Sequence, residues 1–228
     1  MKYLLIILLA FSFTAGCSNN MDDSGSAPVD NNTEKKDETI NKDQPDQKSK
    51  RNNQYVDNPQ APDTRSLNEI GQTFEDEDGV VTLEAISAHD NTHLIGPVEL
   101  TVKDIKVMNY SPSPDLIDYF HGFTHNEENF NYVKIDVTIR NTSEKAINFA
   151  PISYLETNQG EKKGFKDDFY LESLYGDLSP NEEKTGELGF VLDKTNIKDL
   201  NSITITTSDV FGKEKNSLHK GQKINIEF

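Results

Sequence analysis

The fold is decided by one stretch, Tyr132-Val133-Lys134-Ile135-Asp136-Val137-Thr138-Ile139-Arg140, which is the strongest strand signal in the chain. β-Branched apolar residues occupy every second position, and charged or hydroxyl-bearing residues stand between them. Because successive side chains of a strand point to opposite faces, this alternation predicts a strand with one face in a core and the other toward solvent. A turn-rich run at 141–145 follows it.

Comparable short segments lie on both sides of this stretch. Further β-rich segments fall at 80–86, 98–107, 146–150, 169–172, 187–192, 202–206 and 223–228, the one at 169–172 being weaker. Within 98–107 the apolar alternation slips by one residue, which predicts a β-bulge near Lys103. Seven or eight short strands separated by turn signals, over about 150 residues, predict an all-β fold built as an antiparallel β-sandwich.

One short helix is expected in the long connection 109–130. Residues 114–121 begin with Pro114, which suits a first helical position, and Ser113 precedes it as a potential cap. Gly122 ends the run.

The connection 109–130 is also the candidate binding surface. It is long for a sandwich, and long loops on rigid scaffolds often carry binding. The side chains expected to contact a ligand are aromatic: Tyr110, Tyr119, Phe120 and Phe123. The alternative is that the same segment is a helical plug that covers one end of the sandwich.

The residues before position 79 differ in composition from the strand-rich part. Between positions 21 and 55 the apolar side chains larger than Ala and Pro are limited to Val29 and Ile40. Such a stretch cannot bury enough surface to offset the entropy of ordering it. The sequence therefore predicts a disordered polar linker over 17–78 and one domain over 79–228.

Residues 1–16 have the parts of a secretory signal peptide. A basic residue, Lys2, precedes an apolar stretch at 3–13, and small residues precede Cys17. The stretch is too short to span a bilayer, which needs about 20 apolar residues. Cleavage between Gly16 and Cys17 would remove it.

The run Ala15-Gly16-Cys17 resembles the lipobox of bacterial lipoproteins, although Thr14 stands where that pattern usually has a large aliphatic residue. The resemblance implies that Cys17 is lipidated, becomes the new N-terminus and anchors the chain on the outer face of a Gram-positive cell membrane. The alternative is an ordinary signal peptide with a chance cysteine. As the single cysteine of an exported chain, Cys17 cannot form an internal disulfide, which favours lipidation.

The charge of the chain limits its partners. The formal net charge is −16 at pH 7. An acidic surface repels phosphate backbones, so we expect no nucleic-acid partner. With no disulfide available, the stability of the domain must come from its hydrophobic core. The sequence gives no indication of an oligomeric state.

Two segments together resemble a known domain family. The strand-and-turn segment 132–151 and the segment 178–192 are similar to a domain of Gram-positive lipoproteins with an immunoglobulin-like sandwich, related to telokin-like and mycobacterial secreted-antigen domains. Asn181 stands where the family's Leu-x-Pro-Gly-Glu turn has Gly, and Asn tolerates positive φ. The resemblance covers about residues 79–228. It implies a fold and a location, and no catalytic residues.

His121 and His125 are the candidate ligands for a zinc ion. A spacing of four residues places two imidazoles on one face of a helix. His89 and His93 have the same spacing but fall in a segment that reads as a loop. Histidines that bind nothing are the alternative for both pairs.

The chain carries no recognisable catalytic motif, so we expect no catalytic residue, no cofactor and no enzyme activity. The leading hypothesis is a cell-surface lipoprotein that presents an immunoglobulin-like binding or adhesion module to a protein or an envelope polymer. One alternative is an accessory or structural component of an envelope complex without a ligand of its own. The other is zinc capture through the loop histidines.

Overall fold

A computed structural model describes residues 58–228, which form a β-sandwich of three antiparallel sheets. The first sheet has five strands in the order β1 (Thr73–Asp76), β2 (Gly79–Ile95), β3 (Val98–Pro112), β4 (Phe130–Asn141) and β9 (Glu183–Leu192). The second has the order β13 (Lys223–Glu227), β10 (Ser202–Thr206), β6 (Tyr154–Thr157) and β7 (Lys162–Gly164). The third has the order β12 (Ser217–His219), β11 (Val210–Phe211), β5 (Ile147–Phe149) and β8 (Gly176–Leu178).

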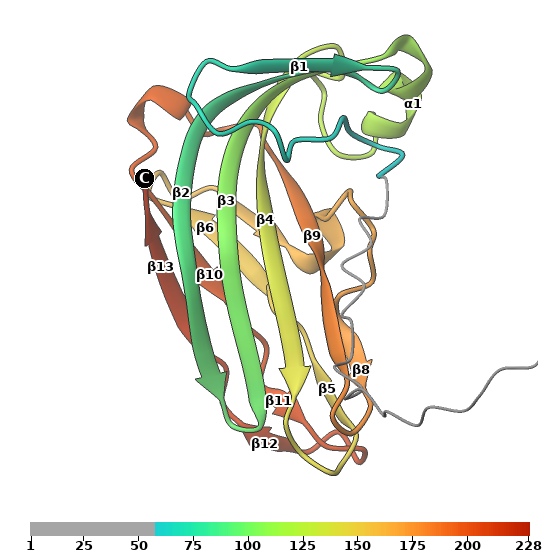
Figure 1. Ribbon diagram of the computed structural model, residues 1–228, viewed down its shortest axis with the longest axis vertical. Helices are drawn as coiled ribbons and strands as arrows, with labels where there is room; N and C mark the ends of the chain where they lie inside the picture. The colour runs from blue at the N-terminus through green and yellow to red at the C-terminus, as the bar shows by residue number, and fades with distance from the viewer. Residues whose placement is uncertain (1–57) are drawn as a thin grey trace, which may run out of the picture. The chain divides into compact units, whose positions relative to one another are not determined.

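The long strands β2, β3 and β4 form one layer, and the short strands of the other two sheets lie behind it (Figure 1). This arrangement confirms the prediction of an all-β antiparallel sandwich. The predicted bulge in β3 is also present, because the pairing of β3 with β4 shifts between Val102 and Ile105. The weak segment 169–172 is not a strand. The residue just before it, Asp168, forms one isolated bridge with Phe190.

The alternation in β4 explains the main core. Val133, Ile135 and Val137 point between the layers, where they meet Leu155 and Ile205 of the second sheet in one buried cluster. Burying a side chain of this size contributes about 1.5–3 kcal/mol relative to leaving it exposed.

The other face of β4 is also covered at one end, by a second buried cluster. Tyr132 of β4 and Tyr110 of β3 lie there against Phe120 and Phe169. Gly189 of β9 allows this close packing, because a Cβ at that position would collide with the rings of Tyr170 and Phe169. The first sheet is therefore a middle layer at this end.

Three segments supply the cover over the second cluster. They are residues 58–72, the loop around η2 (Phe165–Asp167) and the connection containing η1 (Pro114–Leu116) and α1 (Ile117–Phe120). Figure 1 shows α1 and β1 at the same end of the first sheet. The remaining 3₁₀ turn, η3 (Ile197–Asp199), precedes β10.

The expected domain boundary at 78/79 is wrong. Ala61 and Leu67 are each 1 % exposed and belong to the second cluster, and β1 pairs with β2. Composition did not reveal this, because only a few apolar side chains of the polar stretch are needed to attach it to the aromatic cluster. The signal peptide at 1–16, Cys17 and the linker up to residue 57 lie outside the described residues.

The expected helix at 114–121 is found as the 3₁₀ turn η1 followed by the single α-helical turn α1. Ser113 precedes it with extended backbone but makes no capping hydrogen bond through its side chain. Within residues 58–228, every helix is too short or too polar to cross a membrane.

Candidate functional site

A groove of about 710 Å³ lies over the third sheet. Strand pairing builds it, because Asn148 of β5 lies opposite Asp177 of β8 on one side and Phe211 of β11 on the other. The neighbours of Asn148 on β5, Ile147 and Phe149, are buried in the main core, so Asn148 points outward. The result is a row of carboxylate, amide and phenyl groups across three strands.

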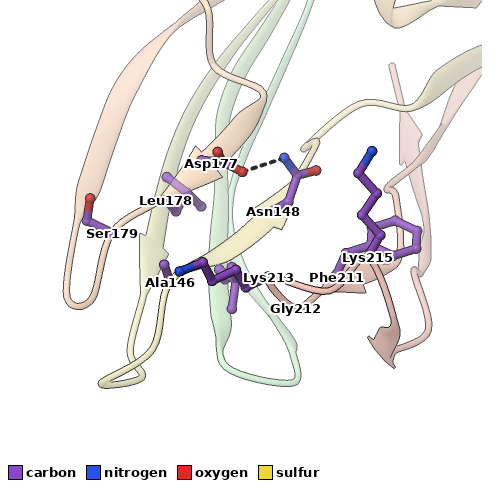
Figure 2. A pocket seen from close by; sticks show the side chains of 10 residues that line it. Ala146, Asn148, Asp177, Leu178, Ser179, Phe211, Gly212, Lys213 and Lys215 are labelled. Carbon is purple, nitrogen blue, oxygen red and sulfur yellow. Dashed lines mark hydrogen bonds between the residues drawn. The ribbon is translucent and has the colours of Figure 1, made fainter.

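Hydrogen bonding fixes the polar part of the groove. The Asn148 amide donates to the Asp177 carboxylate over 2.8 Å, as Figure 2 shows. The Phe211 ring is half-buried at the other end of the row. Ile147 and Leu178 also line the groove, with side chains that are buried in the main core.

Two lysines complete the lining, Lys213 and Lys215 from the turn after β11. The turn is closed by hydrogen bonds between the backbone of Gly212 and that of Lys215 and Asn216, and Lys215 adopts a left-handed φ of 60°. In the view of Figure 2 their ammonium groups lie on opposite sides of Asn148. Within the described part of the chain, neither lysine forms an ion pair with a carboxylate.

The groove therefore combines three kinds of recognition. Lysine ammonium groups attract anions as point charges. The amide and carboxylate pair can exchange hydrogen bonds with hydroxyl groups, and the phenyl face can pack against an apolar or sugar-ring surface. Such a lining suits an anionic ligand rich in hydroxyl groups.

Sequence reasoning missed this site, because its residues come from three segments separated by about 30 positions each along the chain. β5, β8 and β11 are two or three residues long, too short to give a periodic signal. The signal that could have been used is the pair of lysines around Glu214, next to Gly212, in an otherwise acidic chain.

The connection 109–130, expected to be a binding loop, packs its aromatic side chains against the first sheet. Tyr110 and Phe120 are fully buried, so their rings are not available to a ligand and their assignment as binding residues is wrong. The Tyr119 hydroxyl donates to the Phe169 carbonyl over 2.7 Å, and Phe123 packs against Tyr119 and Phe120. The segment therefore forms a plug, the alternative considered above. Its aromatic residues cover apolar surface on the first sheet that would otherwise be exposed.

The candidate zinc ligands His121 and His125 are near one another, with ring centroids 6.2 Å apart. His121 Nδ1, however, is 2.5 Å from the Glu127 carboxylate. Within residues 58–228, no group of three or more His, Cys, Asp or Glu side chains is arranged to hold a metal ion.

His89 and His93 lie on strand β2, so their assignment to a loop is wrong. Their Nε2 atoms are 3.3 Å apart, and the rings are nearly parallel, with 10° between their planes. Burial lowers the pKa of His93, and the neighbouring His89 lowers it further.

A separate group of charged side chains surrounds Lys134, whose side chain is 1 % exposed. Its Nζ is 2.6 Å from Glu187 and 3.1 Å from Asp136. Burial disfavours the Lys134 ammonium, but the two carboxylates outweigh burial and raise its pKa above the ordinary value. Burial also raises the pKa of Glu187, against the opposing effect of Lys134.

Two further carboxylates attach the loop around η2, which we call the covering loop, to β9. Asp168 accepts from the Gly189 N–H and Glu172 accepts from the Glu187 N–H, each over 2.9 Å. Burial outweighs these hydrogen bonds and raises the pKa of Asp168 to about 6 and that of Glu172 to about 7. Because Lys134, Asp168 and Glu172 each contact β9, we interpret the cluster as structural.

Comparison with known proteins places the chain among relatives without an assigned activity. The family model described as "Domain of unknown function (DUF4352)" matches residues 69–216. The uncharacterized protein YdhF of Bacillus subtilis is 38 % identical over 241 residues, covering 100 % of both chains. The SPbeta prophage-derived uncharacterized lipoprotein YonS of the same organism is 25 % identical over 166 residues, covering 69 % of this chain and 70 % of that one.

One solved structure is also similar. It is a functionally unknown protein from Listeria monocytogenes EGD-e, with a TM-score of 0.46 and 17 % identity, covering 66 % of this chain and 88 % of the other.

Proposed function

Since this chain belongs to the DUF4352 family of domains of unknown function, its role has to be argued from its own surfaces, and we propose that it is a lipid-anchored binding module of the cell envelope. The observation that carries the binding role is the groove over the third sheet. Lys213 and Lys215 stand there without carboxylate partners among the described residues, beside apolar surface, in a chain whose net charge is −16.

The membrane anchor is supported by the leader pattern that ends at Cys17 and by the name of one relative, YonS, which is called a lipoprotein. Two or three acyl chains on Cys17 would give a stable anchor, because each buried CH₂ contributes about 0.8 kcal/mol. The anchor would keep the domain at the outer surface of the membrane.

Cys17→Ser is expected to move the protein from the membrane fraction to the culture medium or to leave it as an uncleaved precursor, because serine cannot carry the thioether-linked lipid. Fractionation and immunoblotting of cells that produce each form measure this. Thr14→Leu, which restores the usual lipobox residue, is the control and stays in the membrane fraction. If Cys17→Ser remains in the membrane fraction as a cleaved chain, the anchor is wrong.

The ligand that suits the groove is an anionic polymer with hydroxyl groups, such as a phosphate-bearing glycan of the wall. Phosphate oxygens would pair with Lys213 and Lys215, and hydroxyl groups would bond with Asn148 and Asp177. The attraction between the lysine ammonium groups and phosphate oxygens acts at contact, against the long-range repulsion that follows from the net charge of −16.

Reversing both lysines, Lys213→Glu with Lys215→Glu, is expected to weaken binding to isolated Bacillus subtilis walls by about tenfold or more, since two attractive contacts become repulsive. Sedimentation of residues 18–228 with walls, before and after removal of their phosphodiester polymers, measures this. The control reverses two exposed lysines elsewhere, Lys194→Glu with Lys198→Glu, and carries the same net charge.

Equal binding of both double variants would exclude the groove as the binding site, and equal binding to intact and stripped walls would exclude the phosphodiester polymer as the ligand. Absence of any binding would favour the alternative, an accessory component without a ligand. The other alternative, zinc capture through His121 and His125, gains no support from the geometry, because within residues 58–228 no third His, Cys, Asp or Glu side chain is arranged with them to hold a metal ion.

A further inference from the structure

His89 and His93 form a close pair that strand geometry alone would not produce. A regular strand rises about 3.3 Å per residue, so a separation of four residues places two Cα atoms about 13 Å apart. Strand β2 is irregular between Ala88 and Asn91, and Asp90 within this bulge has a φ of 37°. Despite this expected separation, the Nε2 atoms of the two imidazoles are 3.3 Å apart.

The pair lies where the edge of the first sheet meets the second. Ser87 Oγ donates to the carbonyl of Glu227, the last residue of β13, over 2.7 Å. On the other side of the pair, Gln222 Nε2 donates to the Leu94 carbonyl over 2.7 Å. Both imidazoles are half-buried between these two attachments, so the backbone that carries them is held from both ends.

The two rings face each other through nitrogen. Their centroids are 5.6 Å apart, which exceeds the distance between the Nε2 atoms by about one ring diameter. Each Nε2 therefore points toward the other, and a single proton between them makes one N–H···N hydrogen bond.

We propose that His89 and His93 bind a transition-metal ion of the zinc and copper class through their two Nε2 atoms. Zinc binds imidazole nitrogen at about 2.0–2.1 Å in tetrahedral geometry, which separates two such nitrogens by about 3.3–3.4 Å. The observed 3.3 Å matches this separation. The ring that donates in the metal-free pair moves its proton to Nδ1, and both rings tilt so that both Nε2 lone pairs face the ion.

Two imidazoles leave the remaining positions of the ion open to water or to an external ligand. Imidazole suits Zn²⁺ and Cu²⁺, with Cu²⁺ bound more tightly, whereas Ca²⁺ and Mg²⁺ prefer oxygen ligands. The site therefore discriminates by ligand type. It is independent of the groove, since it lies on different strands and the two make opposite demands on ligand charge.

Isothermal titration of residues 18–228 with ZnCl₂ and CuCl₂ tests the site, in a chain that lacks the Cys17 thiol. We expect His89→Ala and His93→Ala each to weaken binding of both ions by about tenfold or more. The matched control removes the other pair, His121→Ala with His125→Ala, and keeps full affinity. CaCl₂ gives no heat of binding.

A spectroscopic measurement makes the test independent of whether the variants fold. In NMR spectra of imidazole ¹⁵N nuclei, substoichiometric ZnCl₂ should shift the Nε2 resonances of His89 and His93 and leave those of His121, His125 and His219 unchanged. Unchanged affinity in His93→Ala, a loss in the control pair, or shifts spread over all histidines would each overturn the proposal.

Discussion

Lys134→Met is expected to lower the free energy of unfolding by about 3–5 kcal/mol, because it leaves two carboxylates beneath the covering loop without their cation. Lys134 Nζ is 2.6 Å from Glu187 and 3.1 Å from Asp136, and its side chain is 1 % exposed. Methionine keeps most of the volume of the lysine side chain, so the lost stability comes from the missing charge rather than from a cavity. A domain of this kind has about 5–15 kcal/mol in total, which makes the loss a large fraction.

The effect of this substitution depends on pH in a defined direction. Burial raises the pKa of Glu187, and the Lys134 charge opposes that rise. Removing the charge raises the pKa of Glu187 further. A carboxyl whose pKa is higher in the folded state stabilises the fold at low pH, and this contribution is lost as the pH rises through that value. The deficit of Lys134→Met should therefore be smaller at pH 5 than at pH 8.

Urea denaturation at both pH values measures this prediction. The second substitution Glu187→Gln, added to Lys134→Met, should restore part of the stability at pH 8, because it removes one of the two unpaired charges. Lys166→Met at an exposed position is the control and changes stability by less than about 0.5 kcal/mol. A loss that is independent of pH, or that Glu187→Gln fails to reduce, would mean that packing and not charge pairing holds this region.

The sequence predicted the side of the sheet that faces the main core, and the reason is physical. Val133, Ile135 and Val137 alternate over a strand long enough for the period to be evident. The same alternation placed Lys134 on the opposite face, and Lys134 is buried as well. A period of two separates the faces of a strand but does not reveal what covers each face, because the cover comes from distant segments.

The groove was beyond prediction for the same reason. Asn148, Asp177 and Phe211 become neighbours through strand pairing between segments far apart in the chain. The bulge that joins His89 to His93 is a local feature, but it depends on an unusual backbone angle at Asp90 that the residue type permits without requiring. Turn and strand signals predicted the class of the fold. Both candidate sites, by contrast, depend on which residues the strands place opposite one another.

Phe120→Ala is expected to cost about 3–5 kcal/mol of stability, as for other large apolar side chains removed from a core. Phe120 is fully buried, and its ring lies 4.8 Å from that of Phe130, 5.2 Å from that of Phe169 and 5.5 Å from that of Tyr110. These neighbours belong to β3, to β4 and to the covering loop. Removing the ring leaves a cavity where three elements meet.

Two milder substitutions test whether the segment acts only as a plug. Tyr119→Phe removes the hydrogen bond to the Phe169 carbonyl and should cost about 1 kcal/mol. Phe123→Ala removes a half-buried ring and should fall between the other two. Thermal unfolding ranks the three variants, and wall sedimentation shows whether any of them alters binding. A plug predicts that the loss of stability follows burial while the affinity of the folded protein stays constant. A binding loop predicts the reverse, with Phe123→Ala reducing affinity at nearly unchanged stability, and that result would return this segment to the ligand site.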